Sequence, residues 1–170
     1  MPARSAAGQT PAPTLVALDF EVQGAVVSST QIDENIVDEL VRLATEATEF
    51  AYAPYSMFCV GAALVTGDGR FYSGANVENR SYPMSICAER AAVVKAVTAS
   101  RTTLEIAAVA VVEKKEGPCA PCGGCRQVLS EFARAGALLI YRDAHGVFKR
   151  VTIEEALPDA RAFLSDTPPR

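Results

Sequence analysis

The spacing of the cysteines most constrains what this 170-residue chain can fold into. Cys119, Cys122 and Cys125 fall within seven residues in the stretch PCAPCGGC, and Cys59 and Cys87 are the other two. An odd number of cysteines with such a tight cluster does not suit the disulfide framework of a small secreted protein. The cluster instead favours metal ligation or redox chemistry.

Composition and charge narrow the class of protein. With 49% hydrophobic and 21% charged residues, the chain has enough apolar material for the core of one domain. A net charge of −4 without a long basic run argues against a nucleic-acid partner. There is no run of 18 apolar residues to span a membrane, and residues 1–14 lack the apolar segment of a secretory signal. We therefore expect a cytoplasmic protein without a membrane partner.

The chain divides into an N-terminal extension, residues 1–30, and one domain, residues 31–166. The extension begins with a Pro- and Ala-rich stretch, and the alternation in 16–22 indicates a possible extra strand. The hydroxyls of 28–30 are candidate N-caps for an amphipathic helix that ends before Pro54.

The rest of the domain predicts alternating strands and helices. Gly67–Gly69 is typical of a hairpin turn, and the apolar run 106–113 of a buried strand. The predicted strands are 59–66, 70–77, 106–113, 137–143 and 147–151, and the predicted helices are 87–98 and a second that runs from the cysteine cluster to Gly136. This order indicates an α/β fold with a mixed sheet covered by helices on both faces.

Two predicted helices begin with cysteines. Cys87 opens one, and Cys122 and Cys125 lie at the start of the other. A helix N-terminus favours the thiolate, and three thiolates would bind Zn²⁺ with one position open, as in catalytic sites. Glu89 follows Cys87 closely enough to face that position, where a carboxylate can accept a proton from water and pass it to a leaving amine.

Four stretches carry a resemblance to a known family. Cys87-Ala88-Glu89 and Pro121–Cys125 fit the signature of zinc nucleobase deaminases. Over about residues 35–158, the chain resembles the small zinc-dependent cytidine deaminases of homotetrameric type. The stretches that carry this resemblance are AYAPYSMFCVGAAL (51–64), GANVEN (74–79), SYPMSICAER (81–90) and PCGGCRQVLSEF (121–132).

The resemblance implies a fold and an activity. The fold would be a three-layer α/β/α unit with about five strands, which makes residues 31–166 the catalytic domain. The activity would be zinc-dependent hydrolytic deamination of cytidine or deoxycytidine to uridine or deoxyuridine plus ammonia, in pyrimidine salvage. The partners implied are a small nucleoside substrate and identical subunits, in a homotetramer with shared active sites.

The resemblance also implies the role of individual residues. Glu89 would be the general acid/base, and Arg90 would offset the charge of the thiolates. The zinc ligands would be Cys87, Cys122 and Cys125. The substrate contacts would be Phe58 on the pyrimidine, Asn76 and Glu78 on the ribose, the main chain at Ala88 on the base, and Tyr82 across a subunit contact near the 5′ end of the nucleoside.

Three features depart from the family pattern. Cys119 creates a second, overlapping Cys-x-x-Cys, Met57 stands where relatives commonly carry a polar residue, and Phe163 is displaced from the usual C-terminal aromatic position. Two alternatives stay open. One is a deaminase of a modified cytosine nucleoside, such as a blasticidin-type antibiotic; the other is a non-catalytic zinc or redox module in which Glu89 is a surface residue. The residues do not decide between ribose and deoxyribose.

Overall fold

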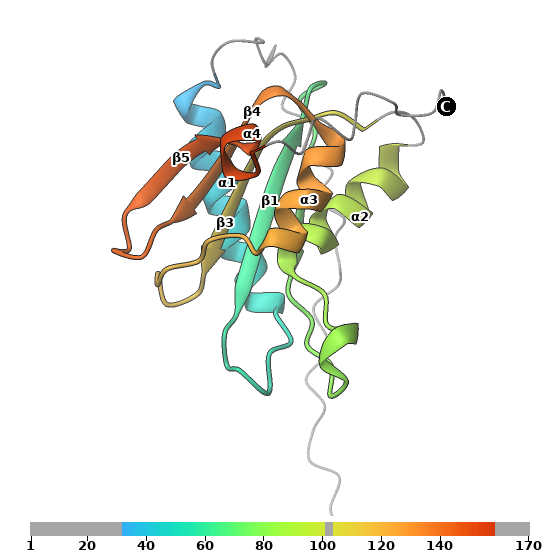
Figure 1. Ribbon diagram of the computed structural model, residues 1–170, viewed down its shortest axis with the longest axis vertical. Coiled ribbons are helices and arrows are strands. Elements are labelled where there is room, and N and C mark those ends of the chain that lie inside the picture. The colour runs from blue at the N-terminus through green and yellow to red at the C-terminus, as the bar shows by residue number, and fades with distance from the viewer. Residues whose placement is uncertain (1–31, 101–103, 159–170) are drawn as a thin grey trace, which may run out of the picture.

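The computed structural model describes residues 32–100 and 104–158 (Figure 1). The predicted extension 1–30 with its strand at 16–22, and Phe163, lie outside the described residues. A five-stranded sheet has the order β2-β1-β3-β4-β5. Its strands are β1 (Val60–Thr66), β2 (Phe71–Ala75), β3 (Ile106–Glu113), β4 (Ala133–Arg142) and β5 (Phe148–Thr152). Neighbouring strands are antiparallel except for β3 and β4, which confirms the predicted mixed sheet.

Helices cover both faces of this sheet. The helices are α1 (Glu34–Ala47), α2 (Ala88–Ser100), α3 (Gly123–Phe132) and α4 (Ile153–Ala156), with short 3₁₀ turns at Thr48–Phe50 and Tyr82–Met84. α1 packs on one face through Ile36, Leu40 and Ala44, and the other three helices pack on the opposite face (Figure 1). Every residue of β1 and β3 is buried because these central strands lie between the two helical layers. The predicted three-layer arrangement is confirmed.

The first helix begins later than its predicted hydroxyl caps. Its N-cap is Asp33, whose carboxylate accepts a hydrogen bond from the Asn35 N–H at 2.8 Å. A carboxylate in this position satisfies a free helix N–H and also complements the helix dipole. The helix ends at Ala47, before Pro54 as predicted.

The predicted end of the second cysteine-bearing helix at Gly136 is wrong. α3 ends at Phe132, and Ala133 already has extended backbone angles as the first residue of β4. Gly136 lies within this strand with φ of 72°, where the register with β3 shifts between Ile106 and Ala108. The glycine therefore permits a bulge in a strand and does not cap a helix.

Two glycines let helices approach the sheet closely. A Cβ added to Gly61 would lie 2.0 Å from the Ala44 carbonyl oxygen, and one added to Gly74 would lie 2.5 Å from the Ala92 nitrogen. α1 and α2 therefore pack directly on backbone, and Gly74 fixes the start of α2 against β2. Within the described ranges, no helix combines the length and apolar character needed to cross a bilayer.

Candidate functional site

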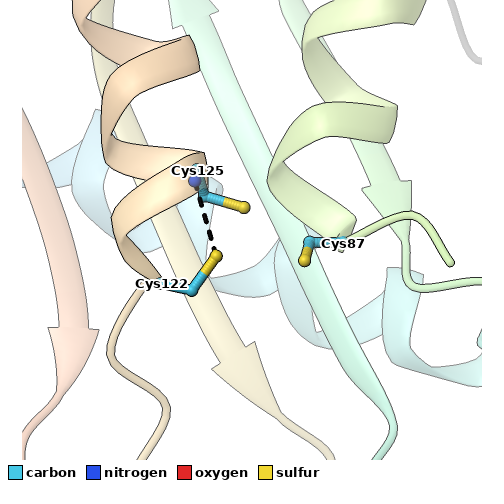
Figure 2. A group of neighbouring side chains, drawn as sticks. All are labelled: Cys87, Cys122 and Cys125. Atoms are coloured by element: carbon cyan, nitrogen blue, oxygen red, sulfur yellow. Dashed lines mark hydrogen bonds between the residues drawn. The ribbon is translucent and has the colours of Figure 1, made fainter. Parts of the chain in front are cut away.

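Three thiols meet at one edge of the sheet. β2 and β3 run in the same direction because each is antiparallel to β1, so their carboxyl ends lie at the same edge. α2 follows β2 and α3 follows β3, which brings the starts of these two helices together. Figure 2 shows Cys87 directly before α2, Cys122 directly before α3 and Cys125 in the first turn of α3. Their ligand Sγ atoms all lie within 4.8 Å of one another. The predicted cysteine trio is thus assembled by the sheet.

Both helix starts stabilise negative charge on the sulfurs. Cys122 is the N-cap of α3, and its Sγ accepts a hydrogen bond from the Cys125 N–H at 3.4 Å. The carbonyl of Cys87 accepts the Ala91 N–H at 3.1 Å, so Cys87 occupies the equivalent place before α2. A hydrogen bond from Cys125, together with the Arg90 charge, lowers the pKa of Cys87 to about 5 against the opposing effect of burial. The same hydrogen bond raises the pKa of Cys125.

The guanidinium of Arg90 lies against this cluster. Its Nη2 donates to the Ser85 carbonyl at 2.9 Å and lies 3.8 Å from the Cys87 Sγ. The hydrogen bond to the Cys87 thiolate is the main reason that the pKa of Arg90 is raised. A permanent positive charge is therefore fixed beside the sulfurs.

Glu89 is buried next to the thiols, with 4% of its surface exposed. Burial raises the pKa of its carboxyl, and the negative charge of Cys87 acts in the same direction. A carboxyl with a raised pKa holds a proton more readily than an ordinary carboxyl, as a general acid does. The non-catalytic alternative placed Glu89 on the surface, and that expectation is wrong.

The donor set of this cluster fits zinc. Bonds of about 2.3 Å to a tetrahedral zinc ion place two sulfurs roughly 3.8 Å apart, so the observed separations need to close only slightly. Three thiolates are soft ligands that zinc accepts, and they leave a fourth position for water or substrate. Cys87, Cys122 and Cys125 are the only such trio among the residues that the structure describes.

Cys119 does not join the cluster. Its side chain is 7% exposed within the main core, and its N–H donates to the Arg142 carbonyl at 3.0 Å. Burial is the main cause that raises the pKa of this thiol to about 12. Cys119 and Cys122 form a Cys-x-x-Cys pattern in the sequence, but the fold does not bring Cys119 into the thiol cluster.

A second group of predicted residues holds the loop before β1. The Val60 N–H donates to the Asn76 Oδ1 at 2.8 Å, and the Asn76 Nδ2 donates to the Phe58 carbonyl at 2.8 Å. The Glu78 carboxylate accepts the N–H groups of Tyr55 and Ser56 at 2.8 and 3.2 Å. Phe58, Asn76 and Glu78 thus belong to one hydrogen-bonded unit.

This unit is joined to the thiol cluster through the backbone. Val77 and Ile86 exchange two N–H to carbonyl hydrogen bonds of 2.9 Å, which ties the strand end at Asn76 and Glu78 to the segment entering Cys87. The Ala88 side chain is fully buried, whereas Phe58 and Tyr82 are 42% and 73% exposed. The Tyr82 ring lies 6.4 Å from that of Tyr55, between centroids.

Two serines in this region escaped the sequence analysis. Ser56 contacts Glu78, and the Ser85 hydroxyl accepts the Asn79 N–H at 3.0 Å. A serine in a loop carries no periodic signal, so only the tertiary contacts distinguish these two from other polar loop residues.

Comparisons with known proteins agree with this geometry. Residues 34–141 match the family described as "Cytidine and deoxycytidylate deaminase zinc-binding region". The chain is 43% identical over 124 residues to the cytidine deaminase of Sporosarcina psychrophila, covering 73% of this chain and 90% of that protein. It is also 43% identical over 121 residues to that of Halalkalibacterium halodurans, covering 71% and 90% respectively. The crystal structure of cytidine deaminase from Burkholderia pseudomallei matches with a TM-score of 0.65 and 45% identity, over 72% of this chain and 96% of that one.

Proposed function

Because the chain belongs to the zinc-binding cytidine deaminase family, we propose that it removes the amino group of cytidine or deoxycytidine by hydrolysis. The products are uridine or deoxyuridine and ammonia, as in pyrimidine salvage. The observation that carries this proposal is the meeting of three thiols beside one buried carboxyl, Glu89, at the starts of α2 and α3. We assign residues 31–166 to the catalytic domain.

Cys87, Cys122 and Cys125 would hold the zinc ion. When bound, zinc supplies Lewis-acid chemistry that makes water a nucleophile at neutral pH. Three thiolates exceed the charge of the ion and weaken this effect. Arg90 offsets part of the excess from its place beside Cys87.

Glu89 moves the protons of the reaction. Its carboxylate accepts a proton from the attacking water and delivers it to the ring nitrogen N3 while a C–O bond forms at C4 of the base. It then passes the second proton of the former water to the amino group, so that the C–N bond breaks and ammonia leaves. The raised pKa of this carboxyl supports both halves of the transfer.

The nucleoside itself binds next to these groups. Phe58 packs on the pyrimidine, Asn76 and Glu78 bind the ribose 3′-hydroxyl, and the main chain at Ala88 contacts the base. The partial exposure of Phe58 and the backbone link through Val77 and Ile86 support this arrangement.

The active subunits form a homotetramer in which Tyr82 reaches a neighbouring active site. Large apolar side chains are exposed along 50–58 and 77–86, which is typical of a surface that another chain covers. They are Phe50, Tyr52, Tyr55, Met57, Phe58, Val77, Tyr82, Met84 and Ile86. A reducing compartment such as the cytoplasm keeps the three thiols available for the metal.

Ammonia release tests the activity directly. We would assay cytidine, deoxycytidine, cytosine, cytidine monophosphate and a blasticidin-type nucleoside with the zinc-loaded protein. Turnover of the two simple nucleosides supports the proposal. Activity on the modified nucleoside alone would contradict it in favour of the specialised deaminase, and zinc binding without turnover of any of the five would contradict both.

A further inference from the structure

The hydroxyl of Ser56 connects two residues of the proposed nucleoside site. Its Oγ donates to the Glu78 Oε1 at 2.5 Å and accepts the Phe58 N–H at 3.0 Å. Glu78 is a ribose contact in the proposed function, and Phe58 is the aromatic that packs on the base. One side-chain oxygen thus contacts both the sugar-binding carboxylate and the backbone of the base-binding residue.

These contacts leave Glu78 with little spare hydrogen-bonding capacity. A carboxylate offers roughly four acceptor positions, and the N–H groups of Tyr55 and Ser56 take two of them on Oε2. The Ser56 hydroxyl takes a third on Oε1. One position therefore stays open on Oε1, which suits a single sugar hydroxyl. The Ser56 hydroxyl is also the main reason that the pKa of Glu78 is lowered, so the carboxyl stays ionised as an acceptor.

The backbone between these residues adopts an unusual conformation. Met57 has φ of 57°, in the left-handed region that a residue with a Cβ rarely adopts. Its N–H donates to the Ala53 carbonyl at 3.0 Å, and the Ser56 hydroxyl bonds the next N–H, that of Phe58. The loop is thus held in this shape from both sides of Met57, as expected where surrounding contacts impose a strained residue.

We propose that Ser56 is a positioning residue whose hydroxyl sets the Glu78 carboxylate and the Phe58 backbone together, and so couples sugar recognition to base recognition. The proposal rests on the proposed function. It assigns Ser56 no contact with the reacting atoms, so its loss should weaken nucleoside binding more than it slows the chemical step.

Steady-state kinetics of Ser56→Ala and Ser56→Thr test the role, with Ser73→Ala in β2 as a control. Loss of a hydrogen bond to a charged group should raise the KM for cytidine by about 10- to 100-fold, while kcat stays within roughly threefold. Ser56→Thr keeps a hydroxyl and should restore most of the affinity. An unchanged KM in Ser56→Ala, or an equal increase of KM in Ser56→Ala and Ser56→Thr, would overturn the proposal.

A second substrate tests the coupling. 2′,3′-Dideoxycytidine has no 3′-hydroxyl for Glu78, so Ser56→Ala should raise its KM less than that of cytidine. An equal increase of KM for both substrates would assign the whole effect to Phe58. It would overturn the proposed coupling of sugar recognition to base recognition.

Amide hydrogen exchange keeps the test independent of turnover. The Phe58 amide should exchange about fivefold faster or more in Ser56→Ala, because its acceptor is gone, and should stay protected in Ser56→Thr. The Val60 amide, which donates to Asn76, is the internal control. An unchanged Phe58 exchange rate would overturn the positioning role, whereas a wild-type protein inactive on cytidine would overturn only the proposed function.

Discussion

Arg90 contacts the Cys87 sulfur at 3.8 Å while the same guanidinium nitrogen donates to the Ser85 carbonyl at 2.9 Å. The hydrogen bond to the backbone carbonyl holds the guanidinium beside the Cys87 sulfur. A lysine would offer one ammonium and could not reproduce the planar geometry.

Replacing this guanidinium should weaken the metal centre. We expect Arg90→Gln to reduce zinc affinity or kcat by about 10- to 100-fold, because the charge of the thiolates is then uncompensated. Competition with a chelator measures the affinity, and ammonia release measures kcat. Arg70→Gln is the control, since Arg70 pairs with Asp68 at the hairpin turn. Equal effects of the two substitutions would contradict the assigned role.

Removal of the Glu89 carboxylate should abolish turnover without loss of metal. Glu89→Gln keeps the size of the side chain but cannot shuttle protons, so we expect kcat to fall by about 10²- to 10⁴-fold at full zinc content. Glu113→Gln is a matched control, because Glu113 is buried to a similar degree but binds the N–H groups of Lys115 and Gly117. Substantial residual turnover in Glu89→Gln would rule out the carboxylate as the proton carrier.

Substitution of two buried cysteines, Cys119 and Cys125, should have different effects on the zinc content of the protein. Cys125 belongs to the thiol cluster and Cys119 to the apolar core, although both lie in the same short segment. We expect Cys125→Ala to lose bound zinc and Cys119→Ala to retain one ion per chain. Elemental analysis of the purified variants gives the stoichiometry. Zinc loss in Cys119→Ala, in a protein that is still folded, would contradict the proposed ligand set.

The close approach of α2 to β2 should make Gly74 intolerant of a side chain. In Gly74→Ala the new methyl group would meet the backbone of Ala92 and Ala88, so we expect a loss of about 1–3 kcal/mol or more in the free energy of unfolding. Gly123→Ala is the control, because no atom lies within 4 Å of its added Cβ. Urea denaturation measures both variants, and similar stabilities would contradict the close packing.

The elements that the sequence predicted well are those with local signals. The apolar run of β3 and the Gly-Asp-Gly turn between β1 and β2 carry their structure in neighbouring residues. The end of α3 was not predictable in this way, because the residues after Phe132 suit a helix but are held in the sheet by pairing with β3. Tertiary contact overrides local propensity there.

The same distinction between local signals and tertiary contacts applies to the residues of the candidate site. The three zinc-ligand candidates and Glu89 were found from residue type and spacing, which chemistry restricts to few combinations. The links of Ser56 to Glu78 and of Arg90 to Ser85 depend on how two loops fold against each other. Arg90 was found by resemblance alone, and Ser56 was not found.

The path of the chain through β3 also decides which thiols can meet. Along the chain the three nearest thiols are Cys119, Cys122 and Cys125, whereas in the fold the third member of the cluster is Cys87, which precedes β3 in the sequence. The candidate metal site therefore does not exist until β1, β2 and β3 have paired, because only that pairing brings the starts of α2 and α3 together.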